Sequence, residues 1–376
     1  MKTIYTSVKT AVRLFEKVQK KPRVALGLAA SLGLLLGVAL PAAARNPNAE
    51  NLYSVRKLVS DVPGVAEHTD PDLVNAWGMS HSSTSPWWVS NEGSDTSTLY
   101  RTTDGGNTWA KVPLTVAVEG GPTGQVRNGS TDFKVDAGTG LLPSVFIFAT
   151  ETGSIYGWNG VGTVAIQGVA TPDAIYLGLA IGSVGSANYL YAANFHTGTV
   201  DVFNGTWGPG NLPGTFTDPS LPEGYAPFGI QNIGGVIYVA YAKQDPDDPD
   251  EELHCEGCGY VDAFDTAGNF IERVASAGEL NAPWGLTMAP AGFGKFSGDL
   301  LVGNLGDGRI HAFHRGEDGW EEHGVMKGTD HRPIEIDGLW GIGFGNGVAA
   351  GPTDTLFFAA GPDDETHGLF GSITAP

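Results

Sequence analysis

The pair Trp284-Gly285 opens a strand-like run, and a bulky residue followed by glycine recurs at Trp77-Gly78, Phe228-Gly229 and Trp340-Gly341. Weaker copies are found at Asn128-Gly129 and Leu177-Gly178. The first glycines of the six copies lie at positions 78, 129, 178, 229, 285 and 341, which are 49 to 56 residues apart. Self-similarity at this period indicates an array of six equal structural units.

Each unit continues with a short second run rich in β-branched and aromatic residues, such as residues 145–148 or 236–239. A Gly-containing turn and a third run ending in an aromatic residue follow, as in residues 199–204. Alternation with this composition predicts β-strands, and no sustained helical periodicity occurs after the first 44 residues. Six four-stranded units of about fifty residues predict an all-β fold, the six-bladed β-propeller.

The two ends of the repeat array predict how the ring closes. Residues 51–59 are strand-like and precede the first repeat, whereas the last repeat reaches only a short third strand at residues 368–373. Pairing of these segments would remove an open sheet edge. We therefore expect the N-terminal strand to complete the last blade.

The first 44 residues have the pattern of an export signal. Seven basic residues and one acid lie within the first 23, an uncharged apolar run covers residues 24–40, and Pro41-Ala42-Ala43-Ala44 follows. The pattern predicts a signal peptide cut after Ala44 and one propeller domain over residues 45–376, in a secreted, periplasmic or cell-surface protein. The 17-residue run also allows an uncleaved membrane anchor, although no later run reaches spanning length.

The charge balance excludes several classes of partner and fold. The whole chain has 41 acidic and 21 basic residues, and removal of the first 44 leaves 40 and 14, a net charge of about −26. This excess repels phosphate backbones and argues against nucleic acid as a partner. With 55 glycines and only 16% charged residues, the chain is neither disordered nor a coiled coil.

Polar residues gather where a propeller presents one face, before the inner strands and after the second strands. We call this face the top face, and converging polar groups there form the usual ligand site of such a fold. The same residue types are also ordinary turn formers, so a structural role stays open for each. The predicted ligand-binding residues are Asn75, Asn128, Glu151, Asn194, His196, Asn281, Asn304, Asp307 and Asp337.

The longest top-face insertion, residues 243–258, contains six acids within eight residues and two cysteines. The acids predict either a solvated charged loop or a weak calcium site formed by Asp247, Asp248, Asp250 and Glu251. In an exported chain, Cys255 and Cys258 favour a disulfide. A metal site with His254 or a redox pair are the alternatives.

No catalytic signature is present in the sequence. It contains no Gly-x-Ser-x-Gly elbow, phosphate-binding loop or His-Glu-x-x-His motif. Residues 102–109, Thr-Thr-Asp-Gly-Gly-Asn-Thr-Trp, match the Asp-box of sialidases and other propellers, which is a structural hairpin. A sialidase would also need an arginine cluster, whereas the arginines here are scattered.

Several stretches resemble a family of exported bacterial propeller proteins with NHL-like repeats, some of which end in a PEP-CTERM sorting tail. They span residues 51–374 and include Leu73-Val74-Asn75-Ala76-Trp77-Gly78, Asn194-Phe195-His196-Thr197-Gly198, Ala282-Pro283-Trp284-Gly285-Leu286, Phe296-Ser297-Gly298-Asp299-Leu300 and Ala360-Gly361-Pro362. This chain departs from the family in lacking the tail and in carrying the cysteine pair and the Asp-box. The resemblance implies a propeller and brings no established activity, ligand or catalytic residue.

Three functions are compatible with these features. The first is a non-catalytic module whose top face binds a carbohydrate, peptide or protein. The second is a Ca²⁺-dependent hydrolase of the lactonase or arylesterase type, in which axial Ca²⁺ polarises a carbonyl and is held by residues such as Asn75, Asn128, Glu151, Asn194, Asn281, Asn304 and Asp337. The third is a structural component of an extracellular matrix.

Overall fold

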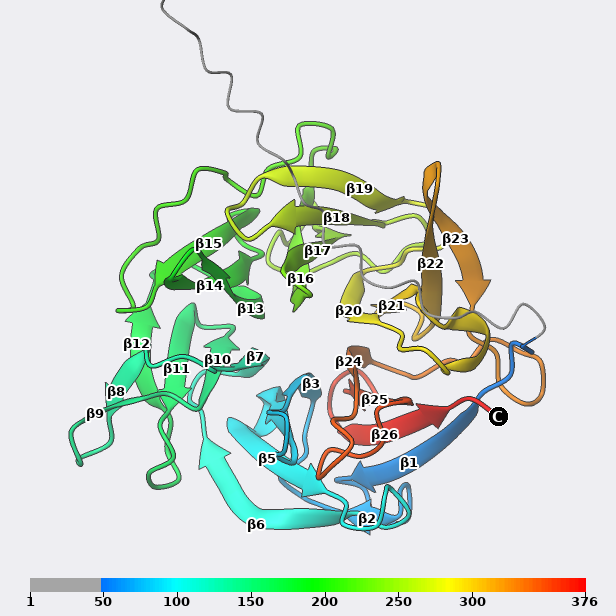
Figure 1. Cartoon of the computed structure of the whole chain (residues 1–376), viewed down its shortest axis with the longest axis horizontal. Helices are drawn as coiled ribbons and strands as arrows, with labels where there is room; N and C mark the ends of the chain where they lie inside the picture. The colour runs from blue at the N-terminus through cyan, green and yellow to red at the C-terminus, as the bar shows by residue number, and fades with distance from the viewer. Residues whose placement is uncertain (1–48) are drawn as a thin grey trace, which may run out of the picture. The chain divides into compact units, whose positions relative to one another are not determined.

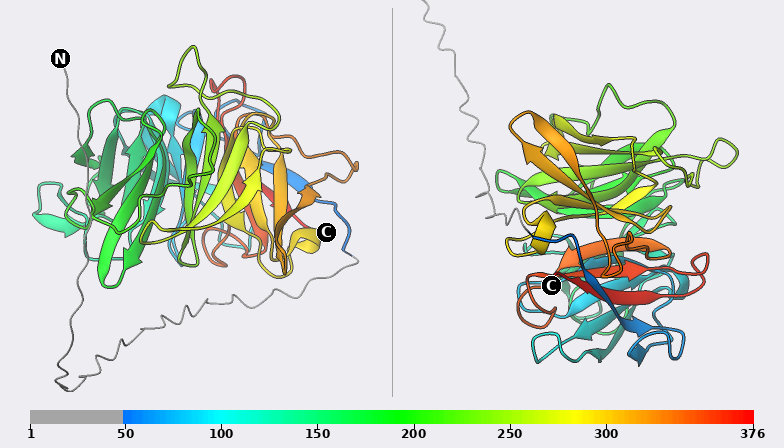
Figure 2. Two further views of the ribbon diagram at one scale, coloured as in Figure 1. Left: turned by 90° about the horizontal axis from the view of Figure 1, so that it is seen from above. Right: turned by 90° about the vertical axis from the view of Figure 1, so that its right-hand side faces the viewer.

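The computed structural model describes residues 49–376, which form six small β-sheets around a common axis (Figure 1). The side view in Figure 2 shows that the loops at the two ends of the strands form two opposite faces of the propeller. This arrangement confirms the predicted all-β, six-bladed propeller. The predicted export signal and its cleavage point at Ala44 lie outside the described residues.

In five blades the strands follow one another outward from the axis in chain order, and in blade 2 the β8–β9 hairpin is inserted after the first strand. Blade 1 contains β3 (Ala76–Ser80), β4 (Trp87–Asn91), β5 (Thr96–Arg101) and β6 (Ala110–Ala117). Blade 2 contains β7 (Pro122–Arg127), β10 (Phe146–Thr150), β11 (Ser154–Trp158) and β12 (Ile166–Ala170). Blade 3 contains β13 (Tyr176–Val184), β14 (Ala187–Asn194) and β15 (Thr199–Asn204). Blade 4 contains β16 (Tyr225–Ile233), β17 (Val236–Lys243), β18 (Gly259–Asp265) and β19 (Phe270–Ser276). Blade 5 contains β20 (Pro283–Met288), β21 (Leu300–Asn304), β22 (Ile310–Gly316) and β23 (Gly319–Val325).

Blade 6 closes the ring with a strand from the other end of the described chain. It contains β24 (Leu339–Phe344), β25 (Thr355–Ala360), β26 (Leu369–Thr374) and then β1 (Ser54–Ser60), which pairs antiparallel with β26. This confirms the predicted closure by the N-terminal strand. The remaining elements are β2 (His68–Thr69), the hairpin of β8 (Lys134–Asp136) and β9 (Leu141–Pro143), and the short 3-10 helices η1 (Glu92–Ser94) and η2 (Gly294–Phe296).

Blade 3 departs from the predicted four strands. Beyond β15 the chain makes only an isolated bridge between Phe203 and Pro209. Residues 205–224 contain four prolines and five glycines. Proline has no N–H for a strand ladder and glycine weakens strands, so a fourth strand does not form there.

A ring of six glycines explains the repeat that marks the sequence. A Cβ atom on Gly229 would lie 2.0 Å from the carbonyl oxygen of Trp284, and one on Gly341 would lie 2.6 Å from that of Trp77. The same backbone approach joins each neighbouring pair of inner strands, so only glycine fits at these positions. The six members are Gly78, Gly124, Gly178, Gly229, Gly285 and Gly341.

The second copy of the repeat was therefore predicted in the wrong register. Gly124 lies in β7, and a Cβ there would lie 2.3 Å from the Leu179 nitrogen, whereas nothing lies within 4 Å of a Cβ on Gly129. Thr123 precedes Gly124 where the strong copies have an aromatic residue, which is why the pattern was missed.

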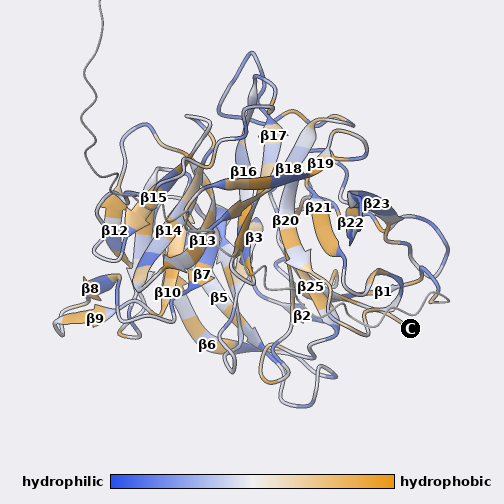
Figure 3. Cartoon of the chain, turned by 45° about the horizontal axis from the view of Figure 1, so that its top comes forward, coloured by the Kyte–Doolittle hydropathy of each residue, from blue (hydrophilic) through white to orange (hydrophobic). Residues whose placement is uncertain are grey.

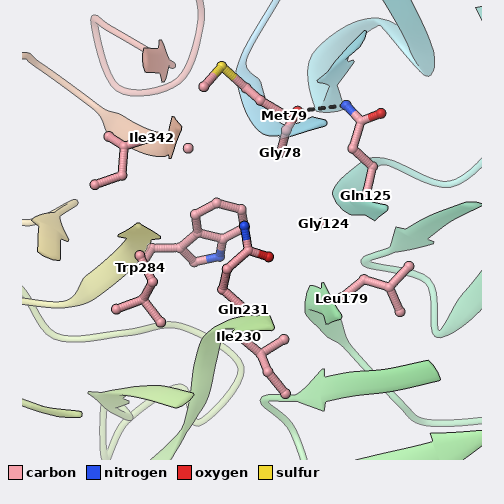
Figure 4. A pocket seen from close by; sticks show the side chains of 11 residues that line it. Gly78, Met79, Gly124, Gln125, Leu179, Ile230, Gln231, Trp284 and Ile342 are labelled. Carbon is pink, nitrogen blue, oxygen red and sulfur yellow. Dashed lines mark hydrogen bonds between the residues drawn. The ribbon is translucent and has the colours of Figure 1, made fainter. Parts of the chain in front are cut away.

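Apolar side chains fill the axis above the glycine ring. The Trp77 and Trp340 rings stack with centroids 3.4 Å apart, and Trp284 meets both edge-on. Below them lies a narrow space of about 30 Å³, with room for about one water molecule. Figure 4 shows some of the side chains that line it, among them Trp284, Gln125 and Gln231. This layer separates the two mouths of the axis. Figure 3 shows the hydrophobic residues on strands such as β10 and β21.

Candidate functional site at the top of the axis

The residue directly after each second strand has the same place in all six blades. Its N–H donates to the carbonyl just before the inner strand, as from Glu92 to Asn75 (2.9 Å) and from Glu151 to Gly121 (3.0 Å). In blades 3 to 6 the position holds Phe195, Gln244, Leu305 and Gly361. Two adjacent blades therefore direct a glutamate to the mouth of the axis where other blades have an apolar residue, an amide or no side chain.

Blade 6 brings a third glutamate to the same mouth through an unusual turn. Asp363, Asp364 and Glu365 have φ angles of 60°, 51° and 63°, all in the left-handed region. Each such residue costs about 1 kcal/mol or more when it carries a side chain. The turn sets the carboxylate of Glu365 against Asn75, whose Nδ2 donates to Glu365 Oε2 (2.7 Å) and to Glu92 Oε2 (2.8 Å).

The acidic insertion of blade 4 adds the remaining charges. The Gln244 side chain donates to the carbonyl of Phe195 (2.9 Å), and His196 Nδ1 lies 2.5 Å from Asp250 Oδ1, so the insertion is tied to the top of blade 3. His254 Nε2 lies 3.0 Å from Glu252 Oε1, and this contact raises the pKa of His254.

These groups form one electrostatic unit, which we call the acidic mouth. It consists of Asn75, Glu92, Glu151, Glu251, Glu252, His254 and Glu365. Burial raises the pKa of Glu151 to about 8, and the charges of Glu92, Glu365, Glu251 and Glu252 add to the rise. Burial also raises the pKa of Glu365 to about 7. Carboxylates that are poorly solvated and close to like charges hold protons at neutral pH unless a cation is present.

Three of the predicted residues, Asn75, Glu151 and Glu251, belong to the acidic mouth. Several others make hydrogen bonds to groups of the protein itself, some within their own turn and some to a different loop. The Asn194 amide caps Ile175 and Thr197 and donates to Asp201, and the Asn304 amide donates to the Glu279 carbonyl. Asp307 accepts from the Arg309 N–H, Asp337 from the Asp363 N–H, and Asn281 is buried beside Gly306.

The prediction that Asn128 lies on the top face is wrong, and its cause is the register error at Gly129. It follows β7 and so lies at the bottom end of its blade, where its side chain donates to the carbonyls of Ser144 (2.8 Å) and Asp132 (3.1 Å). The axial calcium set proposed from the sequence therefore does not converge on one point.

The predicted calcium residues of the insertion do not converge either. Asp247 and Asp248 are exposed, and Asp250 pairs with His196. Across residues 49–376, no group of three or more His, Cys, Asp or Glu side chains is placed to hold a metal ion.

Two predicted local features have clear positions in the structure. Cys255 and Cys258 form a disulfide, with their Cα atoms 5.3 Å apart, at the base of the insertion. In the Asp-box, Asp104 accepts from Thr108 N–H (2.9 Å), and Trp109 packs against Phe357 and Phe370. The Asp-box therefore joins outer strands and lies apart from the acidic mouth.

Sequence reasoning left Glu92, Glu252 and Glu365 out of the predicted set. Glu92 occupies the same repeat position as Glu151, directly after a second strand, so the sequence does predict its place on the top face. Glu365 carries no such signal, because only the left-handed turn directs it toward Asn75.

The six blades around one axis define the chain as a six-bladed β-propeller, and its charged residues gather at one mouth of that axis. The chain is 32% identical over 334 residues to Uncharacterized protein R648 of Acanthamoeba polyphaga mimivirus, covering 85% of this chain and 80% of that protein. It is also 32% identical over 339 residues to Uncharacterized protein L690 of the same virus, covering 85% of each. The chain belongs to the family of these proteins. The relatives are viral, so the bacterial part of the resemblance is not supported, and no family model matches the chain.

Similar solved structures agree on the fold alone. An α-L-arabinofuranosidase from Fusarium graminearum, solved with an iminosugar inhibitor, has a TM-score of 0.52 at 11% identity and covers 87% of this chain and 98% of its own. A streptogramin B lyase has a TM-score of 0.50 at 12% identity, with 86% and 97% covered. Among the described residues, no helix is long and apolar enough to cross a membrane.

Proposed function

We propose that this protein is an exported, non-catalytic binding module whose acidic mouth captures a positively charged segment of a peptide or protein. The observation that carries the proposal is the convergence of Glu92, Glu151 and Glu365 from three blades onto one partly buried position. A purely apolar ligand would leave these carboxylates without a partner, and a neutral carbohydrate would donate hydrogen bonds to them without neutralising their charge.

The stability cost of the arrangement supports a binding role. Glu365 is held by three consecutive left-handed residues, and its charge repels Glu92, Glu251 and Glu252. Strain of this kind persists where the rest of the fold enforces it, and it concentrates at functional sites. A lysine or arginine side chain would neutralise the cluster and allow Glu151 and Glu365 to ionise.

A titration of the purified full chain with a fluorescein-labelled hexalysine peptide tests the proposal. We expect the Glu151→Gln/Glu365→Gln double variant to bind roughly tenfold or more weakly than the natural chain, because close charge pairs in a desolvated site are strong. Equal affinities for the two proteins would overturn the proposal.

The control must separate the site from the general negative charge of the protein. Glu317 and Asp318 are exposed in the loop between β22 and β23 and form no ion pair within the described part of the chain. The Glu317→Gln/Asp318→Asn variant also removes two carboxyl groups, from the loop between two outer strands and away from the acidic mouth. It should bind hexalysine within about twofold of the natural chain, since exposed charges are screened by salt.

Export is the second part of the proposal, and the basic, apolar and small-residue pattern of residues 1–44 supports it. The expected mature protein begins at Arg45. N-terminal sequencing of protein recovered outside the producing cell tests this, and an intact Met1 on that protein would contradict cleavage. The hydrolase alternative is less well supported, because Asn128, one of its seven ligand candidates, lies at the opposite end of its blade from the acidic mouth.

A further inference from the structure

The bottom mouth of the axis is a second concave site, on the opposite side of the apolar layer from the acidic mouth. It is a hollow of about 550 Å³ where the inner strands end. Pockets of this size accommodate small organic molecules. Its apolar wall includes Met79, Ile181, Met288, Ile342 and Phe344, two of them adaptable methionines.

The charges in this hollow are opposite to those of the protein as a whole. Of the described residues that line it, none is Asp or Glu, although the chain has 41 acids. Arg127, at the end of β7, lines it together with His81, whose ring nitrogens lie 2.9 Å from the carbonyls of Ser82 and Phe344.

Arg127 differs from the other arginines in the described part of the chain. Four of them pair with carboxylates, in the pairs Arg56–Glu67, Arg273–Asp218, Arg309–Glu335 and Arg315–Glu272. Arg101 and Arg332 are exposed. Arg127 is partly buried, its polar contact is a 3.4 Å bond to the Val145 carbonyl, and burial lowers its pKa with no neighbouring carboxylate to offset the effect.

The hollow also holds an uncommitted amide. The side chain of Gln231 lies beside Trp284 in Figure 4 and makes no hydrogen bond within residues 49–376, whereas Gln125 donates to the carbonyls of Gly78 (2.7 Å) and Trp88 (3.0 Å). An arginine without an acid and an amide without a partner, set in an apolar wall, match a ligand with an apolar body and one anionic group.

We propose that the bottom hollow binds a small organic anion, with Arg127 holding the carboxylate or sulfonate and the methionine-lined wall holding the apolar body. This site is separate from the acidic mouth and does not depend on the proposed capture of cationic segments. The bottom hollow binds anions, whereas the acidic mouth binds cationic segments.

Two fluorescent probes with the same aromatic frame test the proposal on the purified full chain. 1-Anilinonaphthalene-8-sulfonate carries the anion, and N-phenyl-1-naphthylamine lacks it. We expect one site for the sulfonate, bound roughly tenfold or more tightly than the neutral probe, because a guanidinium–anion pair is charge-assisted.

Three variants locate the site. Arg127→Gln should weaken sulfonate binding roughly tenfold or more and leave the neutral probe within about twofold, while Arg127→Lys should retain most of the affinity. Gln231→Glu is nearly isosteric and places a negative charge in the hollow, so it should also weaken sulfonate binding selectively. Arg101→Gln, which removes an exposed arginine on β5, is the matched control and should bind as the natural chain does.

Circular dichroism shows which variants are folded, and Gln231→Glu keeps the test valid if Arg127→Gln is not. Equal affinity for the two probes, many weak sites, no sulfonate binding, or unchanged binding in folded Arg127→Gln or Gln231→Glu would each overturn the proposal.

Discussion

The two mouths of the axis are formed by opposite ends of the same six inner strands, yet they carry opposite charge. At the top, five glutamates from four blades gather around Asn75 and His254. At the bottom, the described lining has no carboxylate and includes Arg127. The repeat fixes where a residue lies, but the loops and single substitutions within the repeat decide which charge each mouth presents. One fold therefore offers two sites of different chemistry, separated by a layer of aromatic rings.

The largest expected effect comes from breaking the glycine ring that lies between the two mouths. Gly124→Ala places a Cβ 2.3 Å from the Leu179 backbone nitrogen, a clash that side-chain movement cannot relieve. We expect a loss of about 3 kcal/mol or more in the free energy of unfolding, measured by urea denaturation. Gly129→Ala, five residues away in open space, should change it by less than about 0.5 kcal/mol. Similar costs for the two variants would contradict the place of Gly124 in the glycine ring.

The pH dependence of stability should come partly from the acidic mouth. Glu151 and Glu365 have folded-state pKa values of about 8 and about 7, above their ordinary value of 4.5. Between pH 4.5 and pH 8 the native state therefore binds more protons at these two groups than the unfolded state does. Their contribution to the free energy of unfolding is full below pH 4.5 and is lost as the pH rises through 8. After allowance for partial exposure, we expect a loss on the order of 3 kcal/mol between pH 5 and pH 9.

The Glu151→Gln/Glu365→Gln variant should lose most of this slope in urea denaturation at several pH values. A smaller slope of the same sign should persist, because Asp262, buried beside Arg273, has a pKa raised to about 7. A variant with the full slope of the natural chain would show that the acidic mouth is well solvated.

A substitution at Asn128 tests whether this residue has a structural role or a ligand-binding role. Asn128→Ala removes bonds to the Ser144 and Asp132 carbonyls and to the Ser130 hydroxyl and N–H. We expect a loss of about 1 to 2 kcal/mol in the free energy of unfolding. Hexalysine binding should stay unchanged. A loss of binding without a loss of stability would show that Asn128 belongs to the binding site.

The smallest expected effect is the influence of one mouth on the other. Arg127→Gln should leave hexalysine affinity within about twofold, and Glu151→Gln should do the same for the naphthalene sulfonate, because separated sites behave additively. Fluorescence titration of each probe against both variants checks this. A large cross-effect would mean that the aromatic layer transmits a change between the mouths.

The sequence was sufficient to predict the ring, its closure and the face of the acidic mouth. Strand composition, the spacing of strong copies such as Trp284-Gly285, and the unpaired strand at residues 51–59 each have a direct physical meaning, namely pleated packing, close approach at the axis and an edge that needs a partner. These are local or periodic features, which a single sequence displays.

The composition of the site was less predictable, because it depends on backbone paths that no pattern displays. Glu365 reaches Asn75 only through left-handed residues. Asn194 has a position in the sequence that is typical of a ligand residue, but its amide is hydrogen-bonded to groups of its own blade. The Gly124 copy was missed because Thr123 replaces the usual bulky residue, and that single misreading moved Asn128 to the wrong face.

Proton release during ligand binding tests the central claim most directly. Isothermal titration of hexalysine at pH 7, in buffers of different ionisation enthalpy, counts the protons lost when the peptide binds. If a cation enters among Glu151, Glu365 and their neighbours, binding should release about one proton per peptide, and less than about half a proton in the Glu151→Gln variant. Binding with no proton release, or with equal release in the two proteins, would contradict capture of the cation by the acidic mouth.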